Sequence, residues 1–534
     1  MVKMSTLPVE SSYLFSQSIL SPTNVAILAA TVLVIVLSVE AFKSDFARVA
    51  GIPEVPFALP FVGHLHQLGG RSGKNDATVF TDWGKGLRSS VFQCVLGNQR
   101  TIVVSDWATM KDLWVGQSHS LLDRPHQPGF VDKLGIDLTG SSMTDQVRKC
   151  RAAGMRALAK PNWPKYYHLL EPSSGKFISW LYKSSNNGGN AIDTYIWLRQ
   201  IVFDLCLSLT YGARFGEVDD EFMLKFIKSI NDISAVRSST KTYRHFIPLL
   251  RLIPEATSET IAAERVRRKH RDELYGRYRS RVSAGETVDC IVAALDEEKL
   301  TEEEVHGTCL SLLQAAPDTV ASGVYQTVAW LCSPEGRPTQ QRAFEAILDA
   351  YGGDATLAWD MAFREERVPL ISSMNKETLR FYTFAPYATP RRATKDVIMP
   401  DGVILPAGIT VILNAQQVNH DEAHFGEDAW TYKPDRFVGS EAGLPHVAFG
   451  AGSRICPAVA ISNRIIYALL VRLILAFEME GGAKEGKKPN VHPVEFSDVY
   501  DQLVAHPRFY DCHFKVRDGA WLEGRLSQGA TSQV

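Results

Sequence analysis

The sequence predicts a mainly α-helical catalytic domain with small β-sheets, preceded by a single N-terminal transmembrane helix. Three observations support this fold class: an uncharged apolar stretch near the N-terminus, helical periodicity through a long middle region, and short β-type runs on either side of it. We find neither an internal repeat nor a low-complexity linker. We therefore expect a membrane anchor over residues 1–42, a proline-rich linker over 43–64 and one large domain over 65–534.

The composition is that of a globular protein, because 45% of the 534 residues are hydrophobic and 22% are charged. A net charge of -2 argues against nucleic acid as the main partner. The eight cysteines are scattered and form no Cys-x-x-Cys pair, so neither a zinc ribbon nor a disulfide framework is expected. This usage favours a reducing compartment for the catalytic domain.

The anchor is predicted from residues 11–39, which contain no charged side chain, and from the almost continuous apolar run Val25–Val39. About 20 apolar residues span a bilayer as a helix. A cleaved signal peptide, the alternative, usually has a basic start and a shorter apolar core. Lys43 and Arg48 follow the run, and the positive-inside tendency then places the domain in the cytoplasm.

After the anchor, prolines 53, 56 and 60 predict a stiff extended spacer, because the proline ring fixes φ. The β-type runs are residues 89–96, 101–105, 397–399 and 410–413. A capping-box sequence at Thr301 predicts the start of a long helix, which should end near Cys332, before Ser333-Pro334. At 1.5 Å per residue this helix would be roughly 48 Å long, enough to cross the domain.

The segment 449–457 reads FGAGSRICP and indicates a cysteine presented to a flat ligand. Its two glycines allow a tight turn and a close approach, and Pro457 suits the first turn of the apolar helix expected over 458–477. Cys456 would then lie at a helix N-terminus, where free N–H groups favour a thiolate. A buried structural cysteine is the alternative, but it does not explain the neighbouring Phe, Gly and Arg.

This segment resembles the signature of the cytochrome P-450 family, Phe-x-x-Gly-x-Arg-x-Cys-x-Gly. Phe449, Gly452, Arg454 and Cys456 match it, and Ala458 replaces the last glycine. The resemblance covers nearly everything after the anchor. It implies a haem b cofactor with Cys456 as iron ligand, the other three residues as haem contacts, and Arg454 beside a propionate. A weaker similarity to the fungal phenylacetate hydroxylase group lies in residues 331–336, 376–381 and 459–473.

The resemblance also assigns a structural role to three charged residues. Glu377 and Arg380 are three apart on one expected helix face, and Arg436 follows in a Pro-Asp-Arg-Phe sequence. In the family these residues form a buried network behind the haem, because a buried carboxylate needs cationic partners. Glu264 and Arg267 have the same spacing, but we interpret them as a surface pair.

The long helix contains AAPDT at residues 315–319, which is similar to the family pattern Ala/Gly-Gly-x-Asp/Glu-Thr. Asp318 and Thr319 match, whereas Ala316 replaces the usual glycine. Pro317 cannot donate a backbone hydrogen bond and should kink the helix. The resemblance implies that Thr319 delivers protons to oxygen during catalysis and that Asp318 supplies the relay. A plain kinked core helix is the alternative.

Haem propionates need cations, and the resemblance indicates three further candidates. They are Arg391, His446 and Arg148. The family often has Trp-x-x-x-Arg at the last site, and Thr144 occupies the tryptophan position. Arg148 therefore matches only half of that pattern.

Two other motifs are rejected. His420 and His424 are spaced as in a zincin helix, but the glutamate between them is one place late, so zinc is not expected. Gly450-x-Gly452 lacks the third glycine of a dinucleotide fingerprint. The enzyme should therefore take electrons from another protein. The resemblance implies NADPH-cytochrome P-450 reductase at the endoplasmic reticulum membrane, with cytochrome b5 as a second candidate donor.

By resemblance, the substrate pocket is lined by Gln314, Ala315, Phe384 and Leu503. Apolar walls with Gln314 as a polar handle suit a small hydrophobic molecule. No Lys or Arg lies in residues 383–386, which disfavours a small acid such as phenylacetate. We expect a monooxygenase that inserts one oxygen atom from O2 into a neutral, aromatic or ring-containing secondary metabolite. Two alternatives stay open: a coupling enzyme, isomerase or dehydratase without net oxygen insertion, and a membrane-bound haem sensor or carrier.

Overall fold

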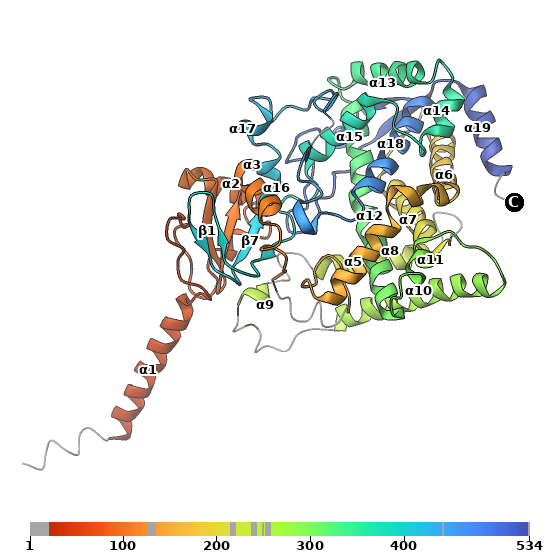
Figure 1. Ribbon diagram of the computed structural model, residues 1–534. Coiled ribbons are helices and arrows are strands. Elements are labelled where there is room, and N and C mark those ends of the chain that lie inside the picture. Colours follow the sequence, from red (N-terminus) through yellow and green to blue (C-terminus); the bar gives the residue numbers. More distant parts are fainter. Residues whose placement is uncertain are drawn as a thin grey trace, which may run out of the picture.

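The computed structural model describes residues 21–125, 135–213, 221–236, 243–247, 250, 258–440 and 443–531. Its helices are α1 (Pro22–Phe42), η1 (Leu65–Gln67), α2 (Asp76–Leu87), α3 (Trp107–Met110), η2 (Lys111–Gly116), α5 (Asp145–Ala157), η3 (Lys160–Lys165), α6 (Tyr167–Ser185), α7 (Tyr195–Tyr211), α8 (Glu221–Val236), α9 (Tyr243–Phe246), α10 (Ser258–Ser283), α11 (Ile291–Asp296), α12 (Glu302–Leu331), α13 (Arg337–Ala350), α14 (Ala355–Met361), α15 (Pro369–Tyr382), α16 (Ala415–Val418), α17 (Glu422–Phe425), η5 (Gly452–Arg454), α18 (Val459–Ala476) and α19 (Gly519–Thr531). Its strands are β1 (Val91–Leu96), β2 (Gln99–Val104), β3 (Ala191–Ile192), β4 (Arg391–Arg392), β5 (Val397–Ile398), β6 (Ile404–Leu405), β7 (Thr410–Leu413), β8 (Phe477–Gly481) and β9 (Cys512–Val516). A large helical body adjoins a smaller β-rich part, from which α1 projects (Figure 1).

The largest sheet has the strand order β1-β2-β7-β4. Strands β1 and β2 pair antiparallel, whereas β2 and β7 pair parallel from Thr101↔Thr410 to Val104↔Leu413. The central position of β2 explains why it is buried along almost its whole length. The four predicted β-type runs are confirmed as β1, β2, β5 and β7.

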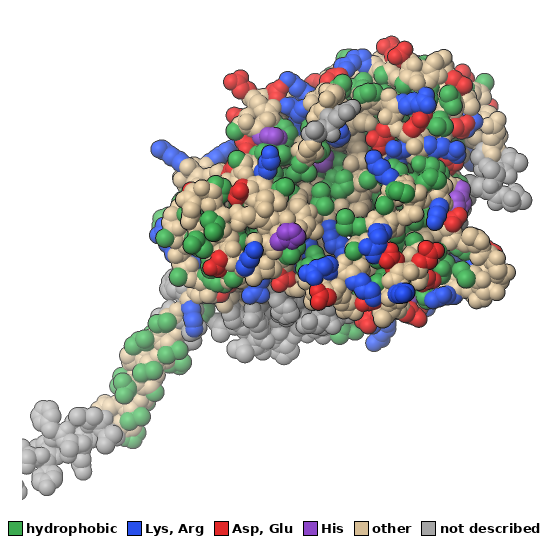
Figure 2. Space-filling model, in the orientation of Figure 1, with side chains coloured by type: hydrophobic (Ala, Val, Ile, Leu, Met, Phe, Trp, Pro, Cys, Tyr) green, Lys and Arg blue, Asp and Glu red, His purple; other side chains and the backbone are tan. Residues whose placement is uncertain are grey.

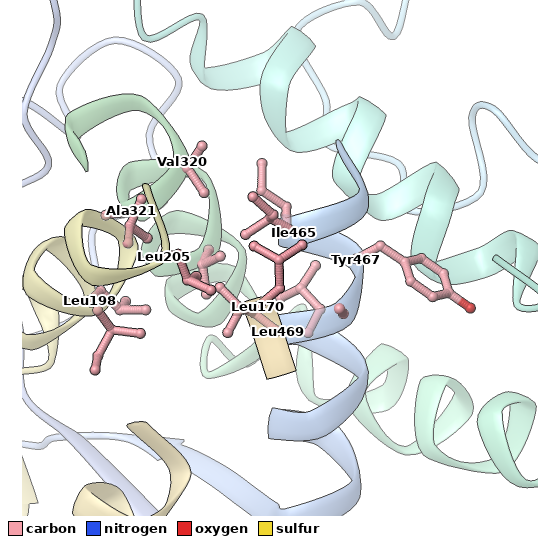
Figure 3. Close-up of a cluster of buried hydrophobic side chains, with 14 of the residues drawn as sticks. Leu170, Leu198, Leu205, Val320, Ala321, Ile465, Tyr467 and Leu469 are labelled. Atoms are coloured by element: carbon pink, nitrogen blue, oxygen red, sulfur yellow. The ribbon is translucent and has the colours of Figure 1, made fainter. Parts of the chain in front are cut away.

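Helix α12 runs through the helical body and organises its core. The predicted capping box is present: the Thr301 side chain accepts from the Glu304 N–H, and the Glu304 side chain accepts from the Thr301 N–H. From Val320 to Leu331 every residue of α12 is buried, as expected for a helix surrounded by others. Figure 3 shows part of this core, where apolar side chains of α6, α7, α12 and α18 meet.

The proline-rich segment, predicted as a stiff extended spacer, is docked onto β1. Val49 and Ile52 are buried, and the Gln93 side-chain amide donates to both of their carbonyls, at 2.8 and 2.6 Å. The Gln93 backbone also bonds to Pro53 and Val55. Gln93 thus forms hydrogen bonds with the backbone of this segment. The predicted linker over 43–64 is therefore part of the folded body.

Helix α1 is 21 residues long and carries exposed apolar side chains such as Val25, Leu28 and Val39. Figure 2 shows apolar side chains along the projecting helix. Its described apolar stretch, Pro22–Val36, is shorter than a full membrane span. Helix α18 is long and apolar enough to cross a membrane, but most of it is buried in the core.

Candidate active site

The cysteine loop is closed by its own backbone. The Cys456 N–H donates to the Phe449 carbonyl at 2.9 Å, which folds the loop back on itself. Gly452 has φ +63°, and a Cβ there would lie only 1.7 Å from the Trp114 carbonyl oxygen of η2. Glycine is therefore required where the loop passes η2.

Cys456 faces a cavity of about 310 Å³ between the loop and α12. Burial raises the pKa of its thiol, while the backbone N–H of Ala458 and the positive charge of Arg151 lower it. Helix α18 begins at Val459, so the predicted helix N-terminus lies directly after the loop. Cys456 is thus a partly exposed thiol with a donor and a cation nearby.

The cavity brings together ten of the residues predicted from sequence. They are Gln314, Ala315, Asp318, Thr319, Phe384, Arg391, Phe449, Arg454, Cys456 and Leu503. Ala385 and Val504 add apolar surface to the same wall. Gly452, within the loop itself, lies against η2.

Four arginines border the cavity, and sequence reasoning missed two of them, Arg124 and Arg151. Arg124 and Arg454 donate to the same carbonyl, that of Thr139, at 3.0 and 3.4 Å. Burial and the neighbouring arginines lower the pKa of Arg391 to about 9 and that of Arg454 to about 10.

Within the described part of the chain, these four arginines donate to backbone carbonyls and to the sulfur of Met143, not to carboxylates. The buried Nε of Arg454 has no partner among the described residues. Buried cations need anions, so this cluster fits the two propionates of a haem. Cys456 lines the same cavity and fits the iron.

Arg148 does not reach the cavity, which corrects the sequence-based expectation. Its side chain is 60% exposed and pairs with Asp145 at 2.7 Å. Arg151, three residues later, lies on the buried face of α5 and donates to the Ile455 carbonyl of the cysteine loop. The buried stripe of α5, which includes Val147 four residues before Arg151, is the signal that could have found it.

His446, a predicted propionate contact, is buried and is not among the residues that line the cavity. Burial and the charges of Arg380 and Lys376 lower its pKa to about 3. Its Nδ1 accepts from the Ala448 N–H at 3.2 Å, and its ring lies 5.8 Å from that of Phe449. The ring supports the loop from behind and does not line the cavity.

The acid–alcohol pair of α12 lies at the cavity wall. The Thr319 hydroxyl donates to the Ala315 carbonyl one turn earlier, at 2.9 Å. The Asp318 carboxylate forms an ion pair with Arg199 of α7, at 2.7 Å. Pro317 lies within α12, directly before this pair.

The three residues assigned a structural role form one buried network. Glu377 and Arg380 are fully buried and pair at 2.7 Å, and Arg436 reaches Glu377 at 3.1 Å. Arg380 also donates to the carbonyls of Asn419 and Ala429, which ties α15 to the segment before the cysteine loop.

The two histidines with zincin-like spacing, His420 and His424, each have contacts within the fold. Burial lowers the pKa of His420 to about 3, and its Nδ1 contacts the Gln416 carbonyl at 2.8 Å. His424 stacks on Trp107 at 3.8 Å between ring centroids. Among the described residues, no group of three or more His, Cys, Asp and Glu side chains could hold a metal ion.

Comparison with known proteins decides the family, because the cytochrome P-450 model matches residues 53–499. The chain belongs to the cytochrome P-450 family. Phenylacetate 2-hydroxylase of Emericella nidulans is 30% identical over 488 residues, covering 89% of this chain and 92% of the relative. The 3-hydroxyphenylacetate 6-hydroxylase of the same organism is 28% identical, covering 92% of this chain and 93% of the relative.

A solved zebrafish cytochrome P-450, with abiraterone, has the same fold with a TM-score of 0.64 and 17% identity. The match covers 83% of this chain and 100% of the zebrafish chain. The protein is thus a cytochrome P-450 monooxygenase, an oxidoreductase of a family that uses haem iron and reductase partners.

Proposed function

We propose that this P-450 holds haem b with the Cys456 thiolate as the protein ligand of the iron. The single observation that carries the proposal is the cluster of four buried arginines in the same cavity as Cys456. Arg391 and Arg454, with Arg124 and Arg151, would hold the propionates. Phe449 would pack on the macrocycle, and Gly452, which has no side chain, would let the loop pass close to η2. When bound, the haem supplies the oxygen-activating chemistry, which a thiolate ligand favours.

The proposed reaction inserts one oxygen atom from O2 into a small neutral molecule with an aromatic or other ring, such as a secondary metabolite. Ala315, Phe384 and Leu503 give the cavity apolar surface. Residues 383–386, which include Phe384 of this cavity, contain no Lys or Arg to pair with a free acid. This distinguishes the proposed substrate from the acids in the names of the two relatives.

Thr319 would deliver protons during the reaction, with Asp318 as the acid of the relay. Electrons would come from NADPH-cytochrome P-450 reductase, and cytochrome b5 is a second candidate donor. The exposed apolar side chains of α1 support a single-pass anchor in the endoplasmic reticulum membrane, with the catalytic domain in the cytoplasm.

A reaction in labelled dioxygen tests the proposed chemistry. The full chain, reconstituted with reductase and a turned-over ring compound, should place one labelled oxygen atom in the product. A product without label favours oxidative coupling, isomerisation or dehydration. Ala316 and Pro317, which depart from the common helix pattern, motivate this second candidate. A protein that binds ligands but never consumes NADPH with them would instead be a sensor or carrier.

A further inference from the structure

A buried ion pair on α10 extends to the cavity wall, which corrects its interpretation as a surface pair. The side chains of Glu264 and Arg267 are 9% and 4% exposed and lie 2.7 Å apart. Arg267 also donates through Nη1 to the side-chain oxygen of Gln314 at 3.1 Å. Gln314 lies on α12 and lines the cavity.

This contact fixes the orientation of the Gln314 amide. A guanidinium donates hydrogen bonds and accepts none, so the amide oxygen must face Arg267. The amide nitrogen, with its two N–H groups, is then directed away from Arg267. It has no hydrogen-bond partner among the described residues, and it is not a fully buried atom.

The other polar side chains of α12 along this wall already have partners. The Ser311 hydroxyl donates to the Gly307 carbonyl and accepts from the Leu138 N–H. The Thr319 hydroxyl donates to the Ala315 carbonyl. Asp318 pairs with Arg199. Among the described α12 side chains that line the cavity, Gln314 therefore offers the unengaged donor.

We propose that Gln314 donates a hydrogen bond to a carbonyl oxygen of the substrate, with Arg267 and Glu264 as positioning residues. The substrate class is then a neutral ring compound that carries an amide, lactam or ketone carbonyl. The proposal rests on the proposed function, in which this cavity holds haem and substrate. Glu264 pairs with both Arg267 and the half-exposed Arg268, at 2.7 and 2.8 Å, and the donor that Gln314 presents to the cavity is a neutral amide. A carboxylate is disfavoured there, because residues 383–386 supply no Lys or Arg to pair with it.

Equilibrium dialysis tests the proposal with three labelled probes on the haem-loaded full chain: phenylacetamide, phenylacetate and propylbenzene. Gln314→Leu should weaken phenylacetamide binding about fivefold to tenfold, the worth of one neutral hydrogen bond. Propylbenzene, which has no acceptor, should bind within about twofold of wild type, because Leu preserves an apolar wall. Gln341→Leu, the same change at an exposed position of α13, should leave the affinity for both probes unchanged.

Two further variants separate orientation from packing. Gln314→Glu keeps the shape but loses the donor when ionised, so it should also weaken phenylacetamide. The charge-balanced double variant Glu264→Gln with Arg267→Met frees the amide to rotate. It should lower the phenylacetamide affinity by about twofold to fivefold while propylbenzene is unchanged.

Equal losses for phenylacetamide and propylbenzene in Gln314→Leu, or no loss for either, would overturn the inference. Wild-type protein that binds phenylacetate more tightly than phenylacetamide would overturn the carbonyl class. These failures differ from failure of the proposed function, which would appear in the wild type as a reduced carbon monoxide complex without the thiolate spectrum.

Discussion

The carboxylate of Asp318 on α12 lies 2.7 Å from the guanidinium of Arg199 on α7. Arg199 also donates to Asn231 of α8 at 2.7 Å, so the ion pair links three helices. Thr319, the next residue, donates to the Ala315 carbonyl and lines the cavity. A proton relay through Asp318 therefore depends on a carboxylate that α7 holds beside the cavity.

Asp318→Asn should lower product formation by about 10²-fold, the usual contribution of a positioned acid or base. Substrate binding should stay close to wild type, because the side chain keeps its shape. Product formation with reductase and the solvent deuterium isotope effect on turnover provide the two readouts, and the isotope effect should rise. Asp349→Asn, an exposed change on α13, serves as the matched control. Wild-type turnover in Asp318→Asn would place the relay elsewhere.

Thr319→Ala should leave haem binding intact and divert reducing equivalents into hydrogen peroxide. The variant removes a hydroxyl at the cavity but only one hydrogen bond, to the Ala315 carbonyl. Peroxide and product are measured together against NADPH consumption. We expect the product per NADPH to fall by about tenfold or more. Unchanged coupling of NADPH to product would contradict a role for Thr319.

Arg148 and Arg151 provide a matched pair on one helix. Arg151→Gln should weaken haem retention, because it removes a buried cation from the cavity. A charge-assisted hydrogen bond contributes about 1.5–3 kcal/mol, so the rate of haem transfer to apomyoglobin should rise roughly 10- to 100-fold. Arg148→Gln, which breaks only an exposed ion pair with Asp145, should retain haem like wild type. Equal transfer rates for the two variants would remove Arg151 from the site.

Two truncations distinguish the anchor from the docked segment that follows it. A chain starting at Lys43 should be released from membranes and keep its haem and its stability. A chain starting at Pro53 also loses buried Val49 and Ile52, at about 1.5–3 kcal/mol for each side chain. Denaturant unfolding of the two soluble forms measures the difference. Equal stabilities would show that residues 43–52 contribute nothing to the stability of the fold. If the chain that starts at Lys43 stays bound to membranes, a second part of the protein contacts the membrane.

Local sequence patterns could predict the elements whose signals are themselves local. The capping box at Thr301 predicted the start of α12, and Pro457 with the apolar run after it predicted α18. The cysteine loop could be predicted because its glycines and arginine have fixed spacings from Cys456. Each of these features depends on neighbours within one turn or one loop.

Contacts between distant segments could not be predicted in the same way. Arg124 borders the cavity because the Thr139 and Thr389 carbonyls hold it there, and no local spacing indicates this. Glu264 and Arg267 have the spacing of an ordinary surface pair, yet the structure buries them. The family pattern indicates Arg148, whereas contacts with distant segments bury the face of α5 that carries Arg151.

The absorption spectrum of the reduced carbon monoxide complex tests the central claim, that Cys456 is the thiolate ligand of haem iron, most directly. Wild-type protein should show the strongly red-shifted Soret band of thiolate ligation. Cys456→Ser should lose this band, whereas Cys150→Ser, a change at a buried cysteine of α5, should keep it. A wild-type complex with an ordinary Soret band, or a Cys456→Ser variant that retains the shifted band, would contradict the account.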